Sequence, residues 1–491
     1  MKFWLGSFIT IVSFFSISNC YASHFTFLDA WQQVLQHSDV LSAQQAAVNR
    51  HRYMQKAAGW QHFPSIHISG QYTRLSDPVE ADARMLEPFA SMDPQVVGQT
   101  LGYMAGTGQI SAQFAHDMGA FLQGIAGQDL QTTTELSPED IYTSSIQAIW
   151  PLFTGWRVSA AEEVAAEQKK EAEAQLNVLR YNQFTALSRI YFGVVLAEQI
   201  LQTRLEAEKG LQIHFEHALA LEKEGQIAKV ERLKAAAALD RARIETQRAR
   251  HILEVSQLAL TKTLHQEEEA SPVSPLFINQ VLPEQESFLA KTLETHPGLA
   301  ILKAKQGQAK GLIRAEKGLY YPNLFAFGDY NLYKQDSILG ESMPDWMVGL
   351  GFTMTLFDSG GRGEKLKAAK AAELQTRYLY SQTKRDLAVL VEKTWKEAQH
   401  ALDEFDGLAS SIALAEENVR LREKGFALGM STSLDVVDAR LFLESVKTQR
   451  LVAAYNYLLS FTRLLAMAGE TELFAQYQST ARAVHHQMPE K

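Results

Sequence analysis

The chain has 491 residues, of which 46% are hydrophobic and 21% charged, and its net charge is −9. This composition excludes an intrinsically disordered chain, and the negative charge argues against a nucleic-acid-binding protein, which needs a basic surface. After residue 22 no apolar run approaches the roughly 20 residues of a membrane-spanning helix, so we expect no helical membrane protein.

Residues 1–22 have the features of a secretory signal peptide. Lys2 precedes an apolar run, and a short polar stretch ends at Ala22, where we expect cleavage. The alternative is a lipoprotein signal cleaved before Cys20, but Asn19 is larger than the residue such signals prefer at that place. If Ala22 is correct, the mature chain has no cysteine, and its stability must come from packing or assembly.

An internal duplication runs through the chain. Residues 37–72 align with 295–330 at a constant offset of 258, and farther along Gly225 aligns with Gly429 at an offset of 204. The difference of 54 residues is an insertion in the first half, between the segments that end near residue 72 and begin near residue 152. Such duplication points to one structural unit used twice.

Long helices are predicted in both halves. Apolar residues recur at helical spacing near 28–60 and 285–318, and all 13 prolines lie outside 152–271 and 345–488. The stretch 362–424 is predicted to be one helix of roughly 95 Å at 1.5 Å per residue. Helices of this length need partners along their whole length, which predicts coiled-coil-like packing of two hairpins that turn at the two aligned glycines.

Four short segments alternate between apolar and polar residues, at 65–73, 144–152, 324–332 and 346–356. One face is predicted to be apolar; it comprises Ile66, Ile68, Tyr72, Ile146, Ala148, Trp150, Leu152, Leu324, Ala326, Tyr330, Leu332, Trp346, Val348, Leu350, Phe352, Met354 and Leu356. This pattern is typical of membrane β-barrel strands, and the alternative is a soluble sandwich. Four strands cannot close a barrel, so the chain must oligomerise; arithmetic leaves both 8 strands from two copies and 12 from three open.

With this order of elements the chain resembles the TolC-type outer-membrane factor (outer membrane efflux protein) family. Residues 150–157 and 353–362 resemble the family's strand-to-helix turn, and residues 428–439 resemble its helix-tip motif. The resemblance covers about 28–470, nearly all of the mature chain.

The resemblance implies a fold class of mixed all-α plus membrane β. The protomer would be internally duplicated, with long antiparallel helical hairpins and four transmembrane strands. A homotrimer would form a 12-stranded barrel in the outer membrane, standing on a 12-helix barrel in the periplasm. The implied function is an exit channel for tripartite efflux or type I secretion. Its implied partners are a periplasmic adaptor (membrane fusion protein), an inner-membrane RND or ABC transporter and outer-membrane lipid. No enzyme activity, cofactor or nucleic-acid partner is implied.

The chain is accordingly divided into eight segments. These are the signal peptide 1–22, the first N-terminal helices 23–64, the first strand pair with its insertion 65–153, the first hairpin 154–270, an equatorial linker with the second N-terminal helices 271–322, the second strand pair 323–357, the second hairpin 358–469 and a C-terminal tail 470–491.

Three acidic residues are candidates for a pore gate. Asp435 and Asp438 match the positions where the family narrows its tunnel, and Glu231 follows Gly225 by six residues, as Asp435 follows Gly429. In a trimer the aspartates would form two rings that attract cations, and mutual repulsion would raise some of their pKa values. The alternative is that they are ordinary acids at a helix N-terminus.

The charged lock of the family cannot form in this chain. Ser431 and Phe426 stand where the resemblance leads us to expect an Arg and a Tyr. We therefore expect a gate held by packing and by repulsion between aspartates or bound cations. The tips around Gly225, Leu428 and Gly429 are the candidates for adaptor docking.

The insertion accounts for the net charge. Residues 75–142 contain ten acids and one base, Arg84, so the rest of the chain is neutral. Its apolar residues indicate some helical structure, and the resemblance places it outside the cell. It either caps the channel mouth in triplicate or is a mobile surface loop.

Other classes of function find less support. His214 and His217 share a helical spacing, but no third ligand accompanies them, so we expect surface histidines and no metal site. The main alternative function is a periplasmic adaptor or another structural coiled-coil protein, although an adaptor normally has one hairpin. An enzyme is a more distant alternative, because we find no credible nucleophile–base arrangement.

Overall fold

The computed structural model describes residues 23–82, 88, 91–125, 133–334, 336–337, 340–341 and 343–484. The predicted signal peptide 1–22, with Cys20, lies outside the described residues. The chain forms two compact units. The first combines the segment up to Lys56 with Glu162–Leu312 and the segment from Lys367, and the second combines Ala57–Ala161 with Ile313–Leu366. Each unit therefore collects equivalent parts of both halves.

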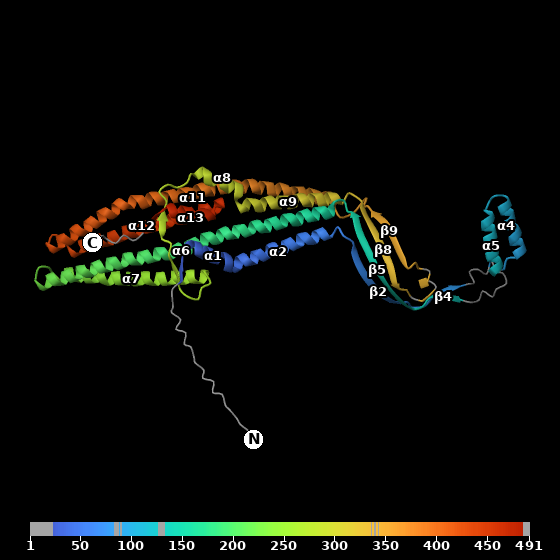
Figure 1. Cartoon of the computed structure of the whole chain (residues 1–491), viewed down its shortest axis with the longest axis horizontal. Coiled ribbons are helices and arrows are strands. Elements are labelled where there is room, and N and C mark those ends of the chain that lie inside the picture. Colours follow the sequence, from blue (N-terminus) through green and yellow to red (C-terminus); the bar gives the residue numbers. More distant parts are fainter. Residues whose placement is uncertain are drawn as a thin grey trace, which may run out of the picture. The chain divides into compact units, whose positions relative to one another are not determined.

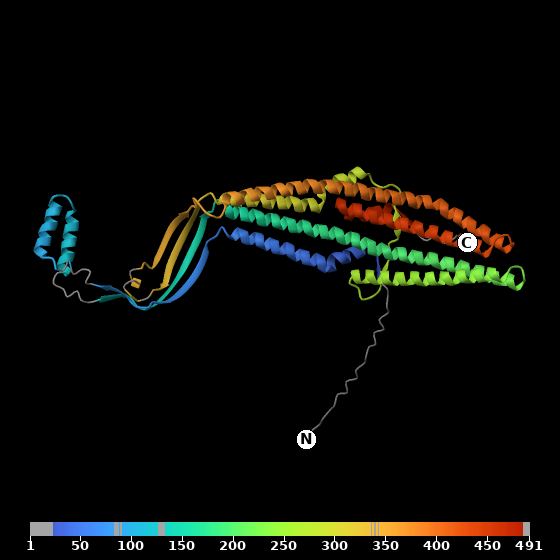
Figure 2. The same ribbon diagram turned by 180° about the vertical axis from the view of Figure 1, so that it is seen from behind.

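Two helical hairpins dominate the first unit. In the first, α6 (Arg157–Lys223) is followed by α7 (Lys229–Thr263), and in the second, α11 (Arg362–Ala427) is followed by α12 (Ser433–Ala468). Figures 1 and 2 show each pair lying side by side from opposite directions. The helix predicted over 362–424 is confirmed and extends three residues farther.

The returning helices are only half as long as their partners. α7 and α12 have 35 and 36 residues, against 67 and 66 for α6 and α11. Along the rest of α6 and α11, the partner in each half is a 22-residue helix, α2 (Asp39–Trp60) or α9 (Pro297–Gly318). Leu41 and Val48 of α2 pack against α6, and Gln306 of α9 bonds Glu373 of α11 at 2.9 Å. The long helices thus have two successive partners.

Matching lengths confirm the duplication. The 11-residue helices α1 (Phe27–His37) and α8 (Gln285–Thr295) precede α2 and α9. The described helices α1, α2, α6 and α7 of the first half therefore have counterparts of nearly equal length in α8, α9, α11 and α12.

An aromatic core lies where the two halves meet in the first unit. Phe27, Phe184, Phe192, Phe277 and Phe474 are at most 1% exposed and their rings contact one another. Two short strand pairs border this core: β1 (Ser23–Phe25) runs parallel to β6 (Ala270–Pro272), and β7 (Leu276–Ile278) pairs antiparallel with β10 (Arg482–Val484).

The predicted C-terminal tail, 470–491, is structured as far as residue 484. A helix, α13 (Phe474–Thr480), follows the end of α12 and leads into β10. Phe474 is fully buried because its ring fills the aromatic core, and β10 adds backbone hydrogen bonds to β7. Residues 485–491 lie outside the described residues.

Two helices are apolar enough to cross a membrane by length and composition, contrary to our expectation. α6 and α12 each contain such an 18-residue window, but 50% and 67% of these windows are buried inside the protein. Phe184 of α6 and Phe461 of α12 belong to the core. Because many apolar residues of both helices pack inside the protein, we assign these helices to the protein interior and not to a membrane.

The second unit contains a four-stranded antiparallel sheet of order β2-β5-β8-β9. Its strands are β2 (Ser65–Arg74), β5 (Asp140–Phe153), β8 (Asn323–Tyr333) and β9 (Trp346–Thr353). The register pairs Ile66 with Ala148, Trp150 with Ala326 and Leu324 with Phe352, so the predicted apolar residues at paired positions share one face. Irregularities of the register leave Leu152 and Leu332 unpaired, and Met354 and Leu356 follow the end of β9.

This apolar face is exposed in the single chain. Ile68, Val348, Leu350 and Phe352 are 72–74% exposed. Apolar side chains from four neighbouring strands thus form a continuous surface of a kind that soluble monomers rarely present to water.

The last strand is shorter than predicted. β9 ends at Thr353, whereas the expected strand continued to Leu356. The Arg362 guanidinium donates to the carbonyl oxygens of Thr355 and Leu356, at 2.8 and 3.1 Å, and to that of Leu319. The carbonyl groups of Thr355 and Leu356 therefore accept hydrogen bonds within the strand-to-helix turn and not from a neighbouring strand.

The insertion forms a ribbon and a helical hairpin. β3 (Val79–Asp82) pairs with β4 (Thr133–Ser137), and α4 (Pro94–Gly106) packs on α5 (Ala112–Ile125). The predicted helical content is confirmed. Because β5 begins at Asp140, the insertion ends at 139 and not at 142. Arg84, Glu87 and Asp129 lie outside the described residues.

Tyr191 generates a test of the core. Its hydroxyl donates to the Phe25 carbonyl at 2.7 Å and accepts from the amides of Val273 and Ser274 at 3.0 and 2.8 Å. We expect Tyr191→Phe to lower the free energy of unfolding by about 1–3 kcal/mol, because three hydrogen bonds are lost and the buried Ser274 amide loses its partner. The Phe25 carbonyl and the Val273 amide keep the hydrogen bond of 2.9 Å that joins them. Urea unfolding of the detergent-solubilised protein, followed by circular dichroism, measures this.

Tyr455→Phe is the matched control. The Tyr455 hydroxyl makes one hydrogen bond, to the Arg189 carbonyl at 3.2 Å. Its loss should cost about 1 kcal/mol or less. Equal effects of both substitutions would contradict the role given to Tyr191.

Candidate functional site

The turns that close both hairpins require glycine. Gly225 and Gly429 have φ of +74° and +71°, which side-chain-bearing residues rarely adopt. A Cβ atom at either position would meet nothing within 4 Å, so the backbone angle and not the space demands glycine. Both turns satisfy the last helix carbonyls, as when the Met430 amide donates to the Gly425 carbonyl at 2.7 Å.

The second tip presents apolar side chains to solvent. Leu428 is 72% exposed, and Met430, which the sequence analysis did not single out, is 75% exposed. Together with the two glycines they form the surface of the predicted docking tips.

Asp435 caps the helix on which it lies. Thr432 is the N-cap of α12, and its amide and hydroxyl donate to the Asp435 carboxylate at 2.8 and 2.7 Å, in a capping box. Arg422 of α11 lies 3.5 Å from the other carboxylate oxygen.

These contacts lower the pKa of Asp435, chiefly through the Thr432 backbone and hydroxyl, with a smaller contribution from Arg422. The rise in pKa expected from repulsion concerns rings of aspartates in a trimer and stays a prediction; within one chain the contacts of Asp435 act in the opposite direction. The alternative reading, an acid at a helix N-terminus, describes its contacts.

Asp438 has different neighbours. Its exposed side chain lines a groove between α7 and α12, together with Lys234, Val437 and Leu441. The two aspartates, although three residues apart, thus face different elements: Asp435 faces α11, and Asp438 faces α7.

Glu231 links the two hairpins. Its carboxylate accepts from the Ser433 amide, at the start of α12, at 2.8 Å and from Lys234 at 3.0 Å. The pKa of Glu231 is lowered, first by Lys234 and then by the Ser433 amide. One carboxylate therefore stabilises the N-terminal turn of two helices, α7 and α12.

Phe426 is buried in a small cluster and does not reach the surface. It is 4% exposed and packs with Ala218 of α6, Ala235 of α7 and Val436 of α12. Ser431 lies in the turn, where its amide donates to the Gly425 carbonyl at 3.2 Å. Packing joins all four long helices at this end of the hairpins.

His214 is a residue that the sequence analysis misjudged. We expected a surface histidine, but it is 4% exposed, whereas His217 is exposed as expected. His214 Nε2 lies 2.7 Å from the Ser433 hydroxyl, and its ring meets the Phe426 ring edge-on at 4.6 Å. The pKa of His214 is lowered to about 4, mainly by burial and further by Arg440 and His217.

Arg440 completes the contacts between the hairpins. It forms an ion pair with Glu423 of α11, and its guanidinium occupies the space where Gly210 of α6 lacks a side chain. We name His214, Glu231, Phe426, Ser433 and Arg440 the tip latch. Of this set, only Glu231 and Phe426 were predicted from the sequence as gate residues. His214 and Ser433 contact each other across 219 positions of the chain, and Arg440 fills the space left by Gly210, so no local sequence pattern marks these contacts.

Within the described ranges, no group of three or more His, Cys, Asp or Glu side chains is arranged to hold a metal ion.

Comparisons with known proteins agree on one family. The model of the family described as "Outer membrane efflux protein" matches residues 30–264 and 288–470. The outer membrane protein TolC of Escherichia coli (strain K12) is 22% identical over 152 residues, which is 30% of this chain and 30% of TolC. That match spans less than a third of the relative's length.

Solved structures share the fold. CusC superposes with a TM-score of 0.70 at 13% identity, over 90% of this chain and 92% of CusC. The outer membrane protein VceC of Vibrio cholerae gives 0.68 at 14% identity, over 90% of this chain and 96% of VceC. At these identities the likeness extends to the fold alone.

The buried histidine predicts a pH dependence. Packed His214 stays neutral down to about pH 4, whereas a detached histidine takes up a proton near pH 6.5. The detached state therefore binds more protons between these values, and the contact weakens as the pH falls from 6.5 to 4. The loss is on the order of 3 kcal/mol at most.

Hydrogen exchange of the amides at 432–436, measured from pH 7 to pH 4.5 and corrected for intrinsic rates, tests this. We expect protection to fall in the wild type and to stay nearly constant in His214→Gln, which keeps a hydrogen-bond donor. His217→Gln is the control and should behave as the wild type. A parallel loss of protection in the wild type and in His214→Gln would refute the role of His214.

Proposed function

This chain belongs to the outer membrane efflux protein family, and we propose that it is the trimeric exit channel of a tripartite efflux or type I secretion system. The family is one of outer-membrane channels. In our proposal an inner-membrane RND or ABC transporter supplies the energy, and a periplasmic adaptor joins it to this channel. Small molecules or proteins then leave the cell through the trimer.

The exposed apolar sheet face carries this proposal. Its side chains, such as Ile68, Leu350 and Phe352, would cost much free energy in water and little in lipid. The edge strands β2 and β9 each have one neighbour. In lipid their unpaired backbone groups would cost several kcal/mol each, which favours pairing of β9 with β2 of the next copy. Family membership favours three copies, hence 12 strands.

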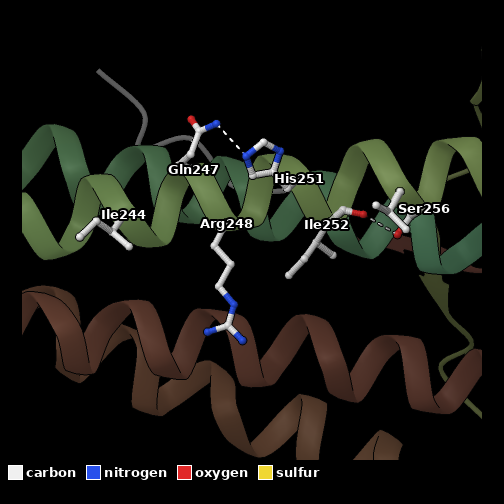
Figure 3. Close-up of a pocket in the computed structure, with 7 residues that line it drawn as sticks. Ile244, Gln247, Arg248, His251, Ile252 and Ser256 are labelled. Carbon is white, nitrogen blue, oxygen red and sulfur yellow. Dashed lines mark hydrogen bonds between the residues drawn. The ribbon is translucent and has the colours of Figure 1, made fainter.

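The helices support assembly in the same way. Ile244, Ile252 and Val255 of α7 are 68%, 52% and 67% exposed. Figure 3 shows Ile244 and Ile252 on the same side of α7 as Arg248. The shallow pocket at this place is lined by residues of α7 alone, so it is an open stripe and not a ligand cavity. In our proposal the helices of a neighbouring copy cover it.

The gate in this proposal lies where α12 begins. Asp435 and Asp438 would form rings of carboxylates in the trimer, and Glu231 with the rest of the tip latch would hold α12 in place. Ser431 and Phe426 leave no charged lock of the Arg–Tyr kind, but Asp435 pairs with Arg422 instead. The closed state would then depend on packing, on the capping box and on cations bound by the rings.

The gate predicts a cation effect. In planar bilayers we expect Asp435→Ala plus Asp438→Ala to weaken block by divalent cations and to change single-channel conductance, because two rings of negative charge are removed. Asp435→Asn, which keeps a polar cap, separates loss of charge from loss of the cap. Unchanged block and conductance in the double variant would exclude these aspartates as the gate.

Adaptor docking is proposed for the tips, and it also gives a test of the channel. Wild-type protein should appear in the outer-membrane fraction as heat-modifiable trimers. Gly429→Glu or Leu428→Glu should abolish export without loss of these trimers, because the exposed tip takes no part in the core. If the wild type is instead found as soluble periplasmic monomers, the channel proposal is wrong. If both variants export normally, the tips are not the docking site.

A further inference from the structure

The sheet face opposite the apolar one is polar over most of its length. It carries His67, Ser69, Gln71, Thr143, Ser145, Gln147, Asp329 and Asn331, as the strand register requires. If the apolar face meets lipid, this second face lines the channel, so the inference below depends on the proposed function.

One end of β8 departs from this pattern. Phe325 and Phe327 lie on the polar face, and their direct partners on β5 are Pro151 and Ile149. Met347 of β9 lies on the same face and is 42% exposed. The alternation of apolar and polar residues predicts a polar face here, and the two phenylalanines depart from that prediction. We name these five residues the aromatic band.

Glycines hold the two rings in place. Phe325 faces Gly351 and Phe327 faces Gly349 across the β8–β9 pair. A Cβ atom at these glycines would lie 2.5 and 2.6 Å from the ring carbons, so the rings occupy the space over the glycine backbone. Their centroids are 6.3 Å apart. Each ring has one side against the strand, and both side chains remain only half-buried.

A carboxylate lies beside the band. Asp329 follows Phe327 by two residues on the same face, which places it roughly 7 Å farther along the strand. No described residue forms a hydrogen bond or ion pair with the Asp329 carboxylate. An aromatic surface next to an uncompensated negative charge is complementary to a molecule that has both an apolar ring and a positive charge.

We propose that Phe325, Phe327 and Asp329 form a contact site for aromatic cations inside the channel, and that its cargo includes amphipathic cationic small molecules. Lipid contact does not account for the two rings, because they lie on the face opposite the lipid-facing one, and packing over the glycines leaves both half-buried. Three copies would place six rings and three carboxylates around the channel.

Block of single-channel current tests this site. Tetraphenylphosphonium supplies rings and a positive charge, and tetramethylammonium supplies the charge without rings. In planar bilayers we expect Phe325→Ser plus Phe327→Ser to raise the half-blocking concentration of tetraphenylphosphonium about tenfold, because two aromatic contacts are lost. Asp329→Asn should raise it for both cations. The tips are identical in all these proteins, so their carboxylates contribute equally.

Two further variants serve as controls. Phe325→Tyr plus Phe327→Tyr retains the rings and should retain block, and Phe352→Leu changes a phenylalanine on the apolar face and should leave block unchanged. If the serine pair does not assemble, Phe325→Leu plus Phe327→Leu keeps apolar side chains over the glycines, and weaker tetraphenylphosphonium block again supports the site.

Equal block of the wild type and of the serine or leucine pair would overturn the contact site while leaving the channel intact. A wild-type protein that forms no pores would instead overturn the proposed function and this inference with it. The two failures are therefore distinguishable in one experiment.

Discussion

The pairing of backbone hydrogen-bonding groups at the sheet edges is the constraint on which the rest of the structure depends. β2 and β9 each use one edge for a neighbour within the chain. An outer-membrane protein cannot leave the other edge open to lipid, since each unpaired group costs several kcal/mol there. A single chain with four strands is thus incomplete. In the proposed trimer, closure by copies of the chain would also bring long helices together, and these would cover the exposed residues of α7, such as Ile244 and Val255.

The part of the structure that a single chain stabilises without partners is the aromatic core in the first unit. The aromatic core brings together Phe27, Phe184, Phe277 and Phe474 from four distant segments of the chain. Beside it, β1 pairs with β6, and β10 pairs with β7. Cooperative packing of this kind can replace disulfides in a chain whose only cysteine is Cys20. The apolar sheet face and the helix stripes contribute to stability only after assembly or contact with lipid.

The sequence was sufficient for features that depend on local periodicity. Alternation with period two predicted which strand residues share a face, and a constant offset predicted the duplication. The unequal hairpins, the buried Phe474 and the buried His214 were not predictable in this way. His214 meets Ser433 across 219 positions of the chain, and no local pattern marks such a contact. The capping box of Thr432 and Asp435 is local, so the alternative of an acid at a helix N-terminus could be stated from the sequence.

The side chains at the start of α12 both stabilise the helix end and belong to the proposed gate. Thr432 occupies one oxygen of the Asp435 carboxylate, and Arg422 approaches the other, so Asp435 is held by its own protomer. Asp438 lies in the groove toward α7 and is the carboxylate more available to a passing cation. If α12 moves when the proposed gate opens, the contacts of Ser433 with His214 and Glu231 must break before the capping box does, because the box moves with the helix. The energetic barrier to opening would then lie in the tip latch, between hairpins, and the aspartates would respond to that movement more than cause it.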